Sequence, residues 1–343
     1  MSFAEEAVRG LRGLDAGVWQ DRLHRRYKEL ETAFQCLLDR GHGDEALAMA
    51  SAVAEFLRTT GRTAAGRRWL DRALAAAASD DRLRAVALYE DGMLAFWQGA
   101  DEEACSLIGR GLELARRLGD QTATALALCG LARVALREGA LDWARALCEE
   151  ALEVVDGTDD LRGRSNALHV LGVAAQMRGD LPRARDLMAR RIELARELGD
   201  VASVGTESSN LSMVERQLGN LARAEELATE ALRIQERRGD EWAIPYSLNG
   251  LAAIAVETGE FERAAGLLGA AAAIVRRQGN AWPPDEAPHF ERSRAAVTAA
   301  LDPERLERAW SAGEGMALAQ AVRYALAAHS GPVPGHDEAG VAG

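Results

Sequence analysis

The stretch ATALALCGLARVALREGALDWARALCEEALEVV, residues 123–155, decides the fold class of this chain. In its first half, leucine, alanine and valine recur at helical spacing until the apolar pattern stops at REG, residues 137–139. A second apolar pattern of the same period runs from Leu141 to Val155. Glycine readily takes the left-handed conformation that ends a helix. The stretch therefore predicts two antiparallel helices joined by a tight turn at Gly139.

The same turn glycine recurs along the chain at a nearly constant interval. The first interval is 38 residues and the next four are 40 residues each, with glycines at Gly61, Gly99, Gly139, Gly179, Gly219 and Gly259. Five positions after each glycine stands a small residue: Gly66, Ala104, Ala144, Ala184, Ala224 and Ala264. A fixed period of this length is typical of a repeat array, in which each unit buries its apolar face against the next. We predict an all-α solenoid of hairpins whose helices cross at these small residues.

Composition and charge narrow the classes of partner and location. The 343 residues are 48% hydrophobic but 5% aromatic, which predicts a core of leucine, alanine and valine. The net charge of −12 argues against direct nucleic-acid binding, because a phosphate-binding surface needs a basic patch. Four scattered cysteines without a CxxC pair suggest a reducing compartment. No apolar run reaches the roughly 20 residues of a membrane span, and the first residues lack a signal-peptide pattern. We expect a cytoplasmic protein that does not bind membranes.

Each unit resembles the tetratricopeptide repeat, which has a Leu-Gly pair in its first helix and small residues in its second. Leu171-Gly172 matches the pair. The second-helix alanines match at Ala144 and Ala151, Ala224 and Ala231, and Ala264 and Ala271. Arg191 replaces the second alanine of its unit, which predicts looser packing there. The resemblance implies a right-handed superhelix with helical caps, and the 40-residue period implies long helices.

Longer segments resemble the repeat domain of actinobacterial LuxR-type and SARP-type ATPase-linked transcriptional regulators. These are VWQDRLHRRYKELETAFQCLLDRG (18–41), GRTAAGRRWLDRAL (61–74), FERAAGLLGAAAAIVRR (261–277) and MALAQAVRYAL (316–326). The resemblance implies a role in bacterial regulation or secondary metabolism. A phosphate-binding loop needs a lysine in GxxxxGK[ST], and the chain's single lysine, Lys28, lies in a predicted helix. We therefore expect the sensor part without the ATPase and DNA-binding modules of those regulators.

The positions where the helical repeat pattern begins, is interrupted and ends predict the domain organisation. Residues 1–17 are a lead-in, and residues 18–280 form the solenoid, with a capping helix at 18–41 and six hairpins. Residues 281–329 form C-terminal capping helices, at about 289–301, 303–313 and 316–328, and the Gly/Pro/Ala-rich residues 330–343 are expected to be disordered. Asp120, Asp200 and Asp240 each follow a Gly and are expected to cap the next helix.

The resemblance implies that the first helix of each unit lines the inside of the superhelix, so the glycine register selects the inward residues. The candidate binding residues are Tyr89, Glu90, Met93, Trp97, Cys129, Arg133, Arg137, Asn166, His169, Asn210, Met213, Arg216 and Asn249. Asparagines can donate and accept, which suits an extended peptide backbone. Arg133 and Arg137, one turn apart, could grip a carboxylate as a fork. The pattern predicts non-catalytic recognition of a peptide, partner protein or small effector in a concave groove, without a cofactor.

Other interpretations remain open at this point. The aromatic residues could be hairpin core, and the asparagines could simply be solvated. His169, Cys129, Tyr89, Glu90 and Arg133 could instead form a site with a Cys–His nucleophile or a His–Glu acid–base pair, in a groove that has acquired catalysis. The other histidines lack ligand spacing such as HExxH, so we expect no metal site. Apolar residues left uncovered at either end of the solenoid could allow a homodimer.

Overall fold

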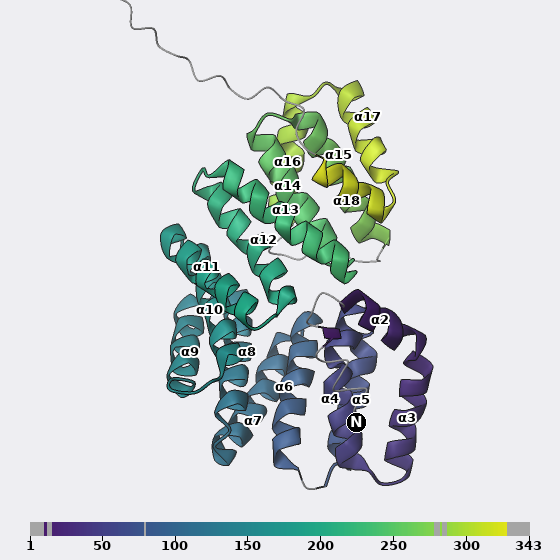
Figure 1. Cartoon of the computed structure of the whole chain (residues 1–343), viewed down its shortest axis with the longest axis vertical. Coiled ribbons are helices and arrows are strands. Elements are labelled where there is room, and N and C mark those ends of the chain that lie inside the picture. The colour runs from purple at the N-terminus through teal and green to yellow at the C-terminus, as the bar shows by residue number, and fades with distance from the viewer. Residues whose placement is uncertain (1–9, 12–15, 79, 278–281, 283–286, 328–343) are drawn as a thin grey trace, which may run out of the picture.

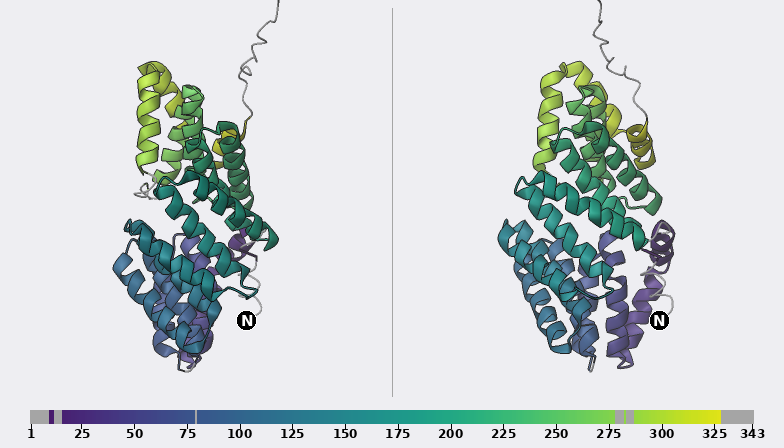
Figure 2. Two further views of the ribbon diagram at one scale, coloured as in Figure 1. Left: turned by 90° about the vertical axis from the view of Figure 1, so that its left-hand side faces the viewer. Right: turned by 60° about the vertical axis from the view of Figure 1, so that its left-hand side comes forward.

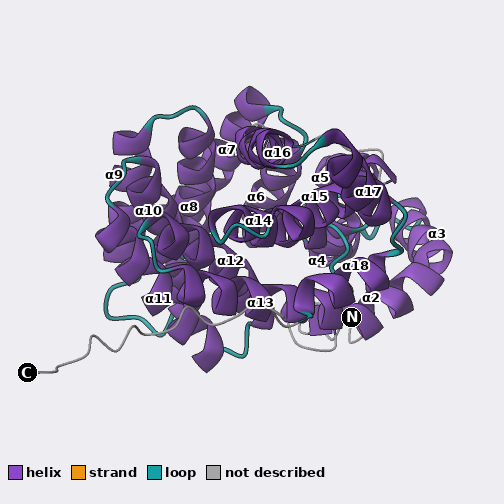
Figure 3. Ribbon diagram, turned by 90° about the horizontal axis from the view of Figure 1, so that it is seen from above, coloured by secondary structure: helices purple, strands orange, loops and turns teal. Residues whose placement is uncertain are grey.

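The computed structural model describes residues 10–11, 16–78, 80–277, 282 and 287–327 as an array of α-helices (Figure 1). The described part contains 17 helices and no strand (Figure 3). Twelve of the helices form six consecutive antiparallel hairpins: α4 (Gly43–Thr59) with α5 (Thr63–Ala76), α6 (Asp81–Trp97) with α7 (Asp101–Leu118), α8 (Gln121–Arg137) with α9 (Leu141–Val154), α10 (Leu161–Met177) with α11 (Leu181–Glu197), α12 (Val201–Gln217) with α13 (Leu221–Arg238), and α14 (Ile244–Glu257) with α15 (Phe261–Arg277). The predicted all-α solenoid of helical hairpins is confirmed.

Further helices flank the hairpins at both ends. The stretch expected to form one capping helix contains α2 (Ala16–Arg25) and α3 (Tyr27–Asp39), because the backbone leaves helical geometry at Arg26 (φ −99°, ψ 10°). At the other end lie α16 (Ala287–Ala300), α17 (Pro303–Glu314) and α18 (Leu318–Leu326). Most of the expected lead-in and the whole expected tail, residues 330–343, lie outside the described residues.

The turn glycines fix how each hairpin reverses direction. All six have a positive φ, between 72° and 82°, which a side chain would strain. At the next junctions, Asp120 and Asp200 cap α8 and α12 by accepting from the backbone N–H groups of Ala123 and Ser203. Asp240 does not cap α14, contrary to expectation. That helix begins later, at Ile244, where Pro245 suits the first turn, and Asp240 accepts from the N–H of Ala243 instead.

The small residues after the turns lie where the paired helices cross. Ala104, Ala144, Ala184, Ala224 and Ala264 are each 0% exposed. A Cβ on Gly66 would lie 3.4 Å from Leu57 Cβ of the paired helix α4 and 3.0 Å from Leu94 Cδ1 of α6 in the next hairpin. The helices therefore approach closely at these positions, and larger side chains there would push them apart.

The superhelix brings α13, of the fifth hairpin, back to α2 near the start of the chain (Figures 1 and 2). Arg238, at the end of α13, is buried and donates to the carbonyl oxygen of Leu11 at 3.0 Å. Trp242 packs edge-on against Trp97, at the end of α6, with ring centroids 5.8 Å apart. These contacts join parts of the solenoid that are far apart in the sequence.

Replacing Gly139 by alanine should lower the free energy of unfolding by about 1–2 kcal/mol, because alanine is strained at its φ of 74°. The matched control is Gly109 in α7, where a Cβ would meet no atom within 4 Å. There alanine should raise the free energy of unfolding by about 0.5–1 kcal/mol, through its better helix propensity. Urea unfolding of the two variants checks the prediction, and equal effects of the two substitutions would contradict it.

Candidate functional site

The first helices of the hairpins line one side of the solenoid. α4 contacts α6, α6 contacts α8, α8 contacts α10, α10 contacts α12, and α12 contacts α14. Within the described residues, the second helices of neighbouring hairpins make no contacts of similar extent. The first helices therefore lie on the inner side of the curve, which we call the concave face.

A pocket lies on this face between α12 and α14, and four of the expected binding residues meet there. Asn210, Met213 and Arg216 line it from α12, and Asn249 lines it from α14. The other lining residues are Ser209, Ser212, Ala228, Tyr246, Ser247, Gly250, Ala253 and His289. The guanidinium of Arg216 is paired with the carboxylate of Glu257. We call this cavity the α12–α14 pocket.

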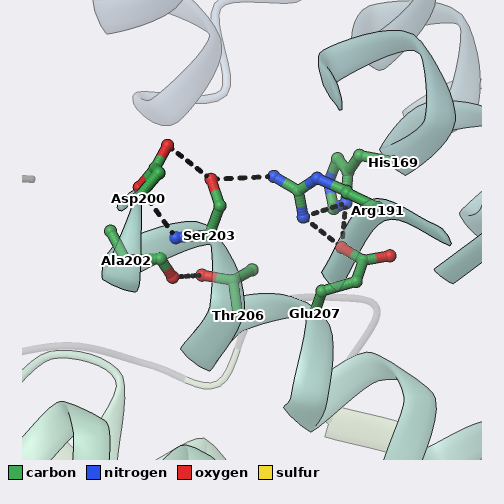
Figure 4. Close-up of polar contacts among 7 residues, drawn as sticks. All are labelled: His169, Arg191, Asp200, Ala202, Ser203, Thr206 and Glu207. Atoms are coloured by element: carbon green, nitrogen blue, oxygen red, sulfur yellow. Dashed lines mark hydrogen bonds and ion pairs between the residues drawn. The ribbon is translucent and has the colours of Figure 1, made fainter. Parts of the chain in front are cut away.

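A second group of polar side chains joins α10, α11 and α12 (Figure 4). His169 Nδ1 lies 2.8 Å from Glu207 Oε2, and Arg191 makes an ion pair with the same oxygen. The other end of the Arg191 guanidinium donates to Ser203 Oγ at 3.3 Å. Glu207 is 0% exposed and Arg191 is 4% exposed. We call His169, Arg191 and Glu207 the central polar cluster.

Burial and charge set the protonation states of this cluster. Burial lowers the pKa of His169 to about 4, with Arg191 adding to the effect and Glu207 opposing it. Burial alone would raise the pKa of Glu207, but Arg191 and His169 outweigh it and hold that pKa below its usual value. Near neutral pH the imidazole is therefore neutral and the carboxylate ionised. Since a carboxylate only accepts, His169 donates from Nδ1 and keeps Nε2 as an acceptor.

Arg133 on α8 differs from the other arginines of the concave face. It is half-buried, and its side chain has no hydrogen bond or ion pair with any residue that the structure describes. Burial lowers the pKa of Arg133, and the nearby charge of Arg191 acts in the same direction, while Tyr89 opposes both. A partly buried cation without a partner is unfavourable, so an anion from outside the chain would be stabilised there.

The expected fork of Arg133 and Arg137 is not present. Arg137 Nη1 donates to the carbonyl oxygen of Phe96 at 2.6 Å and to Asp101 Oδ1 at 2.8 Å. Its guanidinium also lies 3.5 Å from the centroid of the Phe96 ring. Arg137 thus fixes the end of α8 to the previous hairpin. Its guanidinium is not available to bind a carboxylate together with Arg133.

Cys129 does not line the concave face. It is 2% exposed and makes a hydrogen bond with Cys148 of α9, which is 0% exposed. That hydrogen bond and burial raise the pKa of Cys148 far above its usual value. Position 129 shares the register of His169, but its small side chain turns into the hairpin core, so the proposed Cys–His nucleophile is not formed.

The remaining expected residues lie at the edge of the face or among its polar groups. Met93 and Tyr89 pack partly against the core, and Trp97 is 40% exposed, with Arg58 5.2 Å from its ring centroid. Glu90 is half-buried. Asn166 and Asn210 are half-buried, and their side chains make no hydrogen bond with any described residue. These two amides are therefore available to a ligand.

Sequence reasoning missed Glu207 and the role of Arg191. Arg191 does not loosen its unit, because its guanidinium is buried and paired with Glu207. Two violations of the apolar pattern signalled the pair: an arginine at a small-residue position of α11, and a glutamate on the buried stripe of α12. A pair of such violations in neighbouring helices is a sign of a buried ion pair.

Across the described residues, no group of three or more His, Cys, Asp or Glu side chains could hold a metal ion. No helix in the same part of the chain is both long and apolar enough to cross a membrane.

Two models of the tetratricopeptide repeat match the chain, at residues 129–197 and 209–238. These two segments are tetratricopeptide repeats. The repeat solenoid is similar to a Rap protein complexed with competence and sporulation factor (15% identity, 90% of this chain, 85% of that one, TM-score 0.61). It is also similar to NprR in complex with its cognate peptide NprX (15% identity, 82% and 77%, TM-score 0.52).

A third similar structure is a signal transduction ATPase with numerous domains and a tetratricopeptide repeat sensor, from Pyrococcus horikoshii (13% identity, 86% of this chain and 45% of that one, TM-score 0.56). At these identities the likeness shows the repeat fold. No curated protein sequence matches the chain.

The lowered pKa of His169 makes the stability of the repeat solenoid depend on pH. The folded chain favours the neutral imidazole, so this stability is fully present above the usual histidine pKa of about 6.5 and is lost as the pH falls towards 4. Between about pH 7.5 and about pH 5, the free energy of unfolding should fall by about 2 kcal/mol more in the natural chain than in His169→Asn. Urea unfolding at both pH values measures this difference, and identical pH dependence would show that His169 is not buried as described.

Proposed function

We propose that the concave face binds an extended peptide, either free or part of a partner protein, and performs no catalysis. The observation that carries the proposal is Arg133, a half-buried guanidinium that no described side chain pairs. The ligand would place a carboxylate there.

The charges near the centre of the face support an anionic ligand. The nearby charge of Arg191 lowers the pKa of Arg133, and one buried carboxylate, Glu207, lies beside Arg191. Glu207 is paired with Arg191, and His169 is neutral. One positive charge therefore remains at Arg133, in a chain whose net charge is −12. A carboxylate matches the planar guanidinium in a bidentate geometry.

Neutral side chains elsewhere on the concave face suit the rest of a peptide. Asn166 and Asn210 can each donate to a backbone carbonyl and accept from a backbone N–H. Met93 and Met213 add flexible apolar surface, which adapts to different side chains. A few placed polar groups on a mostly apolar surface are typical of binding sites.

Two similar structures support a peptide or protein as the partner. The Rap structure is complexed with competence and sporulation factor, and the NprR structure holds its cognate peptide NprX. The resemblance to ATPase-linked regulators, together with the sensor of the Pyrococcus horikoshii ATPase, supports a regulatory role in the bacterial cytoplasm. A small carboxylate effector is the other ligand that this site would accept.

Acid–base catalysis is the second candidate, and the His169–Glu207 hydrogen bond is the observation in its favour. A histidine with a pKa of about 4 is a weak base near neutral pH. The buried Cys129 contacts Cys148 and offers no activated nucleophile. Binding without turnover is therefore the better supported function.

Arg133→Ala should weaken binding of acidic peptides by about 10- to 100-fold, because it removes a charge-assisted hydrogen-bonded pair. The probes are dodecapeptides selected from a random library on the natural chain, and calorimetry measures their affinity. The control is Arg110→Ala, which removes the same charge from an exposed position on α7. The affinity of Arg110→Ala for the same peptides should stay within about twofold of that of the natural chain, because salt screens the interaction between distant exposed charges. Equal losses in both variants would refute the assignment of Arg133.

A further inference from the structure

The α12–α14 pocket contains a buried hydroxyl that nothing in the described chain uses. Ser247 is 2% exposed, and its Oγ has no hydrogen-bond partner among the described residues. Most buried polar groups in folded proteins are hydrogen-bonded, and an unmade bond costs free energy. Ser247 lines the pocket, so a group entering the pocket from the concave face can supply the missing partner.

Further polar groups around this hydroxyl can both donate and accept. The amide of Asn210 has no partner among the described side chains, and Asn249 adds a second amide that is 3% exposed. Ser212 donates its hydroxyl hydrogen to the carbonyl oxygen of Ala224 at 2.6 Å, which leaves its lone pairs to accept. The pocket therefore presents hydroxyl and amide groups that suit a ligand group with both an N–H and a C=O.

The charge inside the pocket favours a neutral group. Among the described lining residues Arg216 alone is an arginine, lysine, aspartate or glutamate, and Glu257 already pairs with it. A carboxylate in the pocket would compete with Glu257, and an ammonium would lie beside the guanidinium without a buried acid to balance it. A neutral group avoids both costs.

The size of the pocket limits the group to a few atoms. Its volume is about 50 Å³. One water molecule needs roughly 10–15 Å³ of such a cavity, so the pocket has room for about four non-hydrogen atoms. A carboxamide with its first methylene has four. Met213 and Ala253 supply apolar walls for the methylene.

We propose that the α12–α14 pocket binds a neutral carboxamide, the side chain of an asparagine or glutamine in the peptide that the concave face recognises. The assignment rests on the proposed function for its biological setting, but the pocket can be tested without a peptide. The peptide would then be read at two places, by a carboxylate at Arg133 and by a carboxamide beside Ser247.

The test uses propionamide and propionate as probes on the full chain, with affinity measured by saturation-transfer NMR titration. Gly250→Leu fills the pocket, because a Cβ at Gly250 meets no atom within 4 Å. Gly109→Leu makes the same change in open space on α7. Ser247→Ala removes the hydroxyl and should leave the fold intact, because the lost group has no partner to leave unpaired.

The natural chain should bind propionamide, and Gly250→Leu should weaken that binding at least tenfold, Ser247→Ala about three- to tenfold, and Gly109→Leu less than twofold. Propionamide that binds Gly250→Leu and Ser247→Ala as tightly as the natural chain, or that does not bind at about 50 mM, would overturn the proposal. Propionate binding should disappear in Arg133→Ala and persist in Gly250→Leu. Propionate binding to these two variants therefore tests the carboxylate site at Arg133 separately from the carboxamide pocket.

Discussion

The buried ion pair between Arg191 and Glu207 is the interaction on which the concave face depends. Neither charge would be tolerated alone in this position, because an unpaired buried ion costs several kcal/mol. Together with His169 and Ser203 they link α10, α11 and α12 at the centre of the array (Figure 4). The pair also decides the charge of the face, since Glu207 is occupied by Arg191 and is not available to Arg133.

The walls of the concave face are held by contacts between residues far apart in the sequence. Phe96, Trp97, Trp242, Tyr246 and Trp282 form a continuous run, with successive ring centroids 5.3, 5.8, 4.9 and 5.8 Å apart. Aromatic contacts of this geometry stabilise beyond their buried area. The run connects the end of α6 to α14, and so joins the second hairpin to the wall of the α12–α14 pocket. The aromatic contacts that connect distant hairpins of the solenoid therefore also contact the wall of the α12–α14 pocket.

The hairpins were predictable because their causes are local. A glycine such as Gly139 ends a helix through its own backbone freedom, and Ala144 marks a crossing because of its size. The register of those glycines also identified Arg133, Asn210 and Asn249 as inward residues. The pairing of side chains was not predictable, because it depends on distances between helices. Arg137 donates to the carbonyl oxygen of Phe96, and Cys129 makes a hydrogen bond with Cys148. Glu207 pairs with Arg191. In each pair the two residues belong to different helices, so the pattern of a single helix does not predict it.

The most direct test of this account is a crystal structure of the full chain with an acidic peptide selected for binding. We expect a peptide carboxylate on the concave face, with both oxygens within hydrogen-bonding distance of the Arg133 guanidinium and with the Arg191–Glu207 pair unchanged. A peptide bound along the second helices, or one whose carboxylate displaces Glu207 from Arg191 while Arg133 stays unpaired, would contradict it.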